Sequence, residues 1–169
     1  MPDDRRSDVM PLRALGEWVR ATPCVAVAAR WVVGGLFVFS GMSKAVLPHG
    51  EVMALVEQYQ VVPHFLISPI AAGLPWVELA SGTALCIGFL TTAAAWLVVL
   101  QLISFSCLMV VVLIAGIPIE DCGCFGNLGL QETPLQVLIR DLVLLGILAT
   151  VLARRHDAWG IDAWAAKSG

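Results

Sequence analysis

The chain alternates long apolar runs with short polar intervals, and this pattern predicts its helices. Four of the runs are long enough to cross a bilayer, which takes about 20 residues of helix. They end at proline, glycine or polar residues, which are the usual helix boundaries. The second run also contains Pro69, Pro75 and Glu78, and a break at Pro75 is the main alternative to a single span there. The expected spans are 25–46, 65–89, 92–115 and 134–153.

Two shorter stretches have apolar residues at helical spacing outside these spans. Residues 9–19 predict a helix lying on the membrane surface, with a frayed polar leader as the alternative. Residues 49–64 predict a short interfacial helix closed by Pro63, with an ordinary loop as the alternative. Four spans with short connections form an antiparallel bundle. The predicted fold class is therefore an all-α membrane protein, an antiparallel four-transmembrane-helix bundle with short interfacial helices.

Composition supports a membrane protein. Of the 169 residues, 59% are hydrophobic and 14% are charged, whereas soluble domains are about 45–50% apolar and about 25% charged. The lipid bilayer is the expected partner, and a net charge of −3 excludes nucleic acid. The N-terminal residues lack the apolar core of a signal peptide, so we expect a mature chain. We divide it into an N-terminal tail (1–24), a transmembrane domain (25–153) and a C-terminal tail (154–169).

The distribution of basic residues predicts the orientation. Seven of the ten lysines and arginines lie before the first span or after the last, and an even number of spans puts both termini on one side. The loops on the other side lack Lys and Arg and carry acidic residues. By the positive-inside rule, both termini are cytoplasmic, in a cytoplasmic (inner) membrane. The loop at about 120–133 therefore faces the outside.

That outer loop contains two cysteines, Cys122 and Cys124, separated by Gly123. Outside the cytoplasm they meet an oxidising environment. A disulfide between them closes a very small ring, and such strain makes a disulfide easier to reduce and exchange. A structural staple and a pair of free thiols are the alternatives. The acidic neighbours Glu120 and Asp121 raise the pKa of a nearby thiol, so a thiolate here needs a compensating cation, from Lys44 or Arg140.

Three further cysteines, Cys24, Cys86 and Cys107, lie in or beside the spans, where an isolated cysteine usually acts as a small hydrophobic residue. Cys107 is the candidate for a relay to the loop. It lies roughly 13 Å below the outer end of its helix, which is too deep for a direct disulfide with Cys122 unless the loop folds inward.

Four ionisable residues lie within the apolar runs: Arg30, Glu78, Arg140 and Asp141. Such residues are costly in lipid, face the bundle interior and usually pair. Glu78 and Arg140 both enter from the outer side and are expected to meet, while Arg30 pairs with an acid on the cytoplasmic side or snorkels. They form either a structural ion pair or a polar pocket beneath the cysteine loop, able to hold a quinone, another ligand or a proton path.

These residues together resemble a known family. The pattern consists of Arg30-Trp31, Ser40-Gly41, Lys44, Tyr59, Pro63, Pro75-Trp76-Val77-Glu78-Leu79, Asp121-Cys122-Gly123-Cys124-Phe125-Gly126 and Arg140-Asp141-Leu142. It resembles the MauE family of methylamine-utilisation proteins, within the wider DoxX-like group of four-helix membrane proteins, over residues 25–153. The resemblance implies thiol–disulfide handling outside the cytoplasm, with a thioredoxin-like partner and the maturation of a disulfide-rich dehydrogenase subunit.

Three functions remain open. The first is a thiol–disulfide oxidoreductase that exchanges with an extracytoplasmic thioredoxin-like protein and passes electrons to or from a quinone. The second is a soft-metal binder or transporter that uses the same cysteines with His49 or His64. The third is a non-catalytic assembly subunit. The chain has no Cys-x-x-Cys, unlike membrane thiol oxidases of the DsbB type. The expected catalytic residues are Cys122 and Cys124, and the expected cofactor-binding residues are Glu78, Arg140, Asp141, Lys44 and Arg30.

Overall fold

A computed structural model describes residues 23–119, 133–152, 161–162 and 164. These ranges contain helices and no strand. The helices are α2 (Pro23–Val46), α3 (His49–Glu57), α4 (His64–Ile87), α5 (Thr91–Ala115) and α6 (Pro134–Leu152).

Four of these helices, α2, α4, α5 and α6, are long and apolar enough to cross a membrane. Their ends lie within two residues of the expected spans. The predicted fold class is thereby confirmed, and the chain is a multi-pass membrane protein. The predicted surface helix at 9–19 lies outside the described residues.

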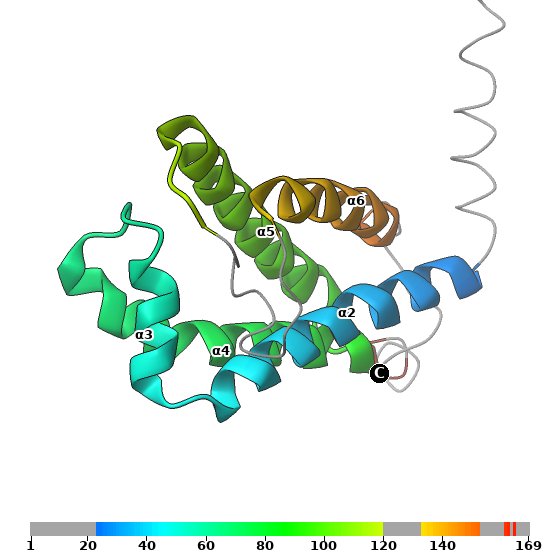
Figure 1. Cartoon of the computed structure of the whole chain (residues 1–169). Helices are drawn as coiled ribbons and strands as arrows, with labels where there is room; N and C mark the ends of the chain where they lie inside the picture. Colours follow the sequence, from blue (N-terminus) through cyan, green and yellow to red (C-terminus); the bar gives the residue numbers. More distant parts are fainter. Residues whose placement is uncertain (1–22, 120–132, 153–160, 163, 165–169) are drawn as a thin grey trace, which may run out of the picture.

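The four spanning helices close into a ring. Helix α2 contacts α4 and α6, and α5 contacts the same two helices. Successive spanning helices run antiparallel, and Figure 1 shows α2 lying along α4, with α5 beside α6. Many large apolar side chains point outward, among them Trp31, Trp96 and Leu142. A lipid bilayer accommodates such a surface, whereas water does not.

Glycines bring the backbones of α2 and α4 together. A Cβ on Gly82 would lie 2.7 Å from the carbonyl oxygen of Gly34, and a Cβ on Gly34 would lie 2.8 Å from that of Gly82. A Cβ on Gly41 would lie 2.8 Å from the carbonyl oxygen of Pro75. Small residues allow this approach in lipid, and the contact fixes the register of the two helices. Gly35, which follows Gly34 in the chain, faces open space.

Helix α4 continues through Pro69 and Pro75, so the alternative of a break at Pro75 is not observed. Its first half packs against α3 through a buried apolar cluster of Val52, Val56, Ile67 and Ala71. The expected interfacial segment is therefore helical over His49–Glu57 and follows a short turn after α2. We call this end of the bundle the α3 end.

At the opposite end, where α4 turns into α5, two charged side chains bond to the backbone of these helices. We call this the turn end. Arg30 Nε donates a hydrogen bond to the Leu85 carbonyl (3.0 Å) near the C-terminus of α4, where a cation complements the helix dipole. The Asp162 carboxylate accepts N–H groups from Leu90 (2.9 Å) and Thr91 (2.8 Å) at the start of α5. Arg30 is 2% exposed, so its guanidinium is enclosed by the helices at this end.

The ionisation of Asp162 is favoured at this position. Burial disfavours the charged carboxylate, but the backbone N–H groups of Thr91 and Leu90, with the charge of Arg30, outweigh that cost. They hold the pKa of Asp162 below its usual value. The described part of the C-terminal segment is thus joined to the α4–α5 turn by an ionised side chain.

Candidate functional site: a charged pocket between the spanning helices

A buried ion pair joins α2 to α4. Lys44 Nζ lies 2.8 Å from each oxygen of the Glu78 carboxylate. Ser40 lies one helical turn before Lys44 and donates its hydroxyl to Glu78 Oε2 (3.0 Å), while it accepts a hydrogen bond from Lys44 Nζ (2.8 Å). The side chains of Lys44 and Glu78 are only 5% and 2% exposed. Every oxygen of this carboxylate has a short, charge-assisted partner.

The second ion pair lies within α6. Arg140 donates from Nε (3.2 Å) and Nη2 (3.0 Å) to the same oxygen of Asp141, Oδ1. The other oxygen, Oδ2, has the Ser106 hydroxyl of α5 at 3.5 Å. Asp141 is 0% exposed, and Arg140 is 24% exposed. Arg140 is thus the more accessible of the two.

A capping interaction positions this second pair. At the start of α6, Thr133 N–H donates to Gln136 Oε1 (2.9 Å) and Gln136 N–H donates to Thr133 Oγ1 (3.4 Å). This reciprocal arrangement is a capping box, and Pro134 occupies the first position of the helix, where proline is favoured. At 1.5 Å per residue, Arg140 lies roughly 9 Å along α6 from Pro134.

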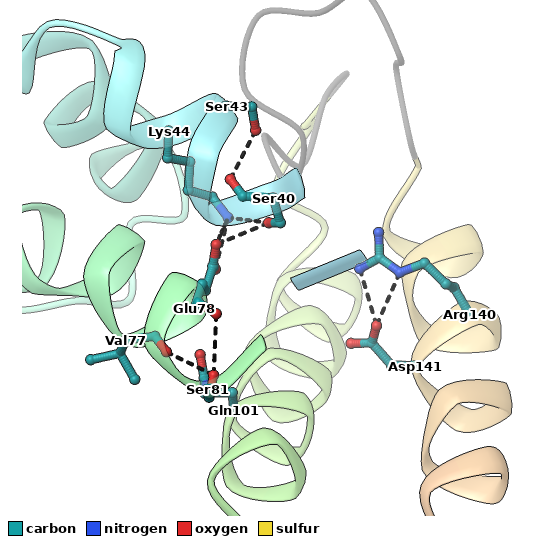
Figure 2. A network of polar contacts seen from close by, with 9 residues as sticks. All are labelled: Ser40, Ser43, Lys44, Val77, Glu78, Ser81, Gln101, Arg140 and Asp141. Carbon is teal, nitrogen blue, oxygen red and sulfur yellow. Dashed lines mark hydrogen bonds and ion pairs between the residues drawn. The ribbon is translucent and has the colours of Figure 1, made fainter. Parts of the chain in front are cut away.

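Both ion pairs line one pocket, to which all four spanning helices contribute. Figure 2 shows Lys44 and Glu78 on one side and Arg140 and Asp141 on the other. The lining residues are Leu36, Phe37, Ser40, Lys44, Glu78, Leu102, Phe105, Arg140, Asp141 and Leu144. The cavity volume is about 40 Å³, and a buried water needs roughly 10–15 Å³. The pocket therefore has room for a few water molecules.

Polar contacts continue below Glu78. Gln101 Nε2 on α5 donates to Ser81 Oγ (3.1 Å), and Ser81 donates in turn to the carbonyl of Val77 (2.7 Å). The Ser81 hydroxyl also lies 3.3 Å from the Glu78 carbonyl (Figure 2). These contacts tie α5 to α4 one turn beyond the ion pair.

The structure groups the predicted site residues differently from the sequence analysis. Glu78 and Arg140 line the same pocket, but Glu78 pairs with Lys44 and Arg140 with Asp141. Arg30 lies apart from this pocket lining, against the carbonyl groups of α4. Cys122 and Cys124 lie outside the described residues, so their place relative to the pocket remains a prediction.

Two residues of α5 that were not predicted as site residues lie at the charged groups: Phe105 lines the pocket and Ser106 contacts Asp141. Phe105 lies 5.8 Å below Lys44 Nζ, measured to the ring centroid, at cation–π distance. An apolar span hides such residues, because their role depends on which face turns inward. The contact of Ser40 with Lys44 could have been predicted from the sequence, since the two residues are four positions apart on the same helix face.

The remaining described cysteines and histidines form no cluster. Cys24, Cys86 and Cys107 have free thiols, and Cys107 is exposed on α5. His49 contacts Ser68 at 3.4 Å. Within the ranges that the structure describes, no group of three or more His, Cys, Asp and Glu residues could hold a metal ion.

Comparison with known proteins identifies the family. The family model for methylamine utilisation protein MauE matches residues 22–154, a range that spans α2 to α6. The chain belongs to the MauE family. It is 30% identical over 145 residues to the methylamine utilization protein MauE of Methylophilus methylotrophus, covering 83% of this chain and 74% of that protein. It is 31% identical over 126 residues to the MauE of Paracoccus denitrificans, covering 74% and 67%. No solved structure matches the chain significantly.

Proposed function

We propose that this MauE-family protein is a membrane-embedded thiol–disulfide redox protein that serves methylamine utilisation. Cys122 and Cys124 exchange with an extracytoplasmic thioredoxin-like protein. The relatives carry the name of that pathway, and the two-cysteine loop supplies the chemistry. The proposed setting is the cytoplasmic membrane, with both termini inside.

The observation that carries the proposal is the convergence of Lys44, Glu78, Arg140 and Asp141 on one pocket. Charged groups inside a membrane are costly and mark functional sites by default. Helices α5 and α6, which lead into and out of the cysteine segment, both line this pocket. The Lys44–Glu78 ion pair joins two helices and so has a structural role. The Arg140–Asp141 ion pair lies within α6 and joins no helices, so a structural role does not explain it.

The proposed reaction is an exchange of one disulfide for another. A thiolate of the reduced partner attacks the Cys122–Cys124 disulfide and forms a mixed disulfide. The second partner thiol then closes the partner's own disulfide, which leaves Cys122 and Cys124 reduced. The partner loses two electrons, the loop gains them, and the protons of the two attacking thiols pass to the two thiolates released.

A cation is needed to stabilise the loop thiolates beside Glu120 and Asp121. Lys44 is buried and bonded to both Glu78 oxygens. The Arg140 side chain is more exposed and lies on the helix that follows the cysteine segment. We therefore assign the compensating charge to Arg140.

A quinone is the expected cofactor of this chemistry, and the pocket meets that expectation only in part. Lys44 and Arg140 are suitable hydrogen-bond donors for quinone carbonyls, and Phe105 and Leu102 provide apolar walls. However, a cavity of about 40 Å³ is far smaller than the roughly 300–1,000 Å³ of small-molecule sites. The pocket as described does not fit a quinone ring, so no step of the proposed reaction passes through a quinone.

The thiol state of the loop tests the proposal. Mass spectrometry after anaerobic purification should find a Cys122–Cys124 disulfide that a reduced thioredoxin-like protein opens. Cys124→Ser should abolish it, while Cys107→Ser, the matched control on α5, should not. A bound metal with both thiols free would favour the soft-metal function instead. Full activity of the Cys122→Ser, Cys124→Ser double variant would leave the assembly role.

A further inference from the structure

The two pocket carboxylates, Glu78 and Asp141, differ in the hydrogen bonds that their oxygens accept. Glu78 receives hydrogen bonds from Lys44 on both oxygens (2.8 Å each) and one from Ser40 (3.0 Å). Asp141 receives both Arg140 contacts on a single oxygen, Oδ1. Its other oxygen, Oδ2, has only the Ser106 hydroxyl, at 3.5 Å, among the described residues. Hydroxyl–oxygen hydrogen bonds are typically about 2.7–2.8 Å, so this contact is weak.

An under-coordinated oxygen matters at this position because Asp141 is 0% exposed. A buried acceptor without a good partner costs about 1–3 kcal/mol, and more for a charged group. Two partners can relieve that cost: a water molecule in the pocket or a proton on the oxygen itself. Asp141 lines a pocket with room for a few water molecules, so both are available.

The charged surroundings favour Asp141 over Glu78 as the proton acceptor. Around the pocket, α2 contributes Lys44, α4 contributes Glu78 and α6 contributes Arg140. Helix α5 has no charged residue and contributes the Ser106 hydroxyl. Protonating Glu78 would leave the buried Lys44 without its counter-ion. Protonating Asp141 removes a carboxylate from beside Arg140, whose side chain is 24% exposed and can retain solvent.

We propose that Asp141 is the proton-exchanging carboxyl of the pocket. The carboxylate takes up one proton at Oδ2, and the net charge of the four groups Lys44, Glu78, Arg140 and Asp141 rises from zero to +1. The proton exchange does not depend on the proposed function.

Infrared difference spectroscopy of the full chain in lipid nanodiscs tests the proton exchange. As the pH is lowered, the carbonyl band of a protonated carboxyl should appear. It should be lost in Asp141→Asn and remain in Glu78→Gln. A band lost in Glu78→Gln but kept in Asp141→Asn would overturn the proposal. So would a set of bands unchanged by either substitution.

Two further variants separate the possible failures. Ser106→Ala removes the weak donor to Oδ2 and should move the midpoint of the band to higher pH; an unmoved midpoint would contradict the assignment to this oxygen. The Cys122→Ser, Cys124→Ser double variant should keep the band. If that variant also keeps full activity, the thiol function fails while the proton exchange stands. If the thiol exchange is confirmed but the Asp141 band is missing, only the present inference fails.

Discussion

At the scale of single residues, the Lys44–Glu78 pair is the most constrained contact of the pocket. Both side chains are nearly inaccessible, and each is the main charge partner of the other among the described residues. Desolvating two charges costs as much as their attraction returns, so the net contribution of such a pair is small. Removing one partner is different, because it leaves a buried charge uncompensated.

Lys44→Met should therefore destabilise the protein by about 3–5 kcal/mol. The double variant Lys44→Met, Glu78→Gln should recover most of that loss, because it leaves no unpaired charge. Unfolding in mixed detergent micelles measures both. Equal losses in the single and double variants would show that Lys44 acts by packing, through its contact with Phe105.

At the scale of helices, the pocket depends on the close contact of α2 and α4. The backbones meet at Gly34 and Gly82, and further along at Gly41 and Pro75. This contact sets the register that brings Lys44 on α2 to Glu78 on α4, although the two residues are 34 positions apart in the chain. Separating the helices should therefore weaken both packing and the ion pair.

Gly82→Ala should destabilise the protein by about 1–3 kcal/mol, the usual cost of overpacking. The new Cβ would lie 2.7 Å from the Gly34 carbonyl oxygen, a backbone atom that cannot rotate away. Gly35→Ala is the matched control, because a Cβ there meets nothing within 4 Å. Unfolding in micelles should separate the two variants, and similar stabilities would contradict this account of the α2–α4 contact.

Helix α5 obtains its N-terminal cap from a distant part of the chain. Asp162 should stabilise the start of α5 while it is ionised, and replacing a capping side chain by Ala typically costs about 1 kcal/mol. Its pKa is lower in the folded protein than the unfolded value of about 3.9. The stabilisation is therefore present above about pH 4 and lost as the pH falls through the folded pKa.

Asp162→Ala should accordingly lower the thermal unfolding temperature at neutral pH, and the difference from the unmodified chain should shrink at strongly acidic pH. Glu57→Ala, at an exposed position on α3, is the control and should have little effect. A pH-independent difference for Asp162→Ala would indicate that the carboxylate charge is not the stabilising feature.

At the scale of the whole molecule, the bundle consists of two helix pairs. The Lys44–Glu78 ion pair lies within α2–α4, and the Asp141–Ser106 contact lies within α5–α6. A large apolar cluster joins the pairs, with Val33, Leu85, Val98 and Leu148 fully buried in it. The charged pocket lies where the two pairs meet, so a small relative displacement of the pairs would change its size.

Orientation is the prediction that belongs to this scale. A membrane-impermeant thiol reagent should label a variant that retains only Cys124 in intact, reduced cells whose outer membrane, if present, is permeabilised. A variant that retains only Cys24, at the turn end of α2, should be labelled only after the cells are lysed. The reverse pattern would invert the topology and place the cysteine loop in the cytoplasm.

Much of the architecture is determined locally and was predictable from the sequence. The apolar runs predicted the four spans, because a helix in lipid must satisfy its own backbone and be long enough to cross. The start of α6 is also determined locally, because its capping box joins residues only three positions apart, Thr133 and Gln136. The sequence also identified Arg30, Glu78, Arg140 and Asp141 as interior charges, since their cost in lipid is independent of the partner.

The partners of these residues were decided only by the tertiary structure. Glu78 pairs with Lys44 and not with Arg140, because the glycine contacts set the rotation and register of α2 against α4. Asp162 caps α5 from more than 70 positions away. Hydrophobic periodicity is a property of one helix and carries no information on how two helices are rotated against each other. The packing of α5 against α6 leaves one oxygen of Asp141 with a single weak partner among the described residues, the Ser106 hydroxyl.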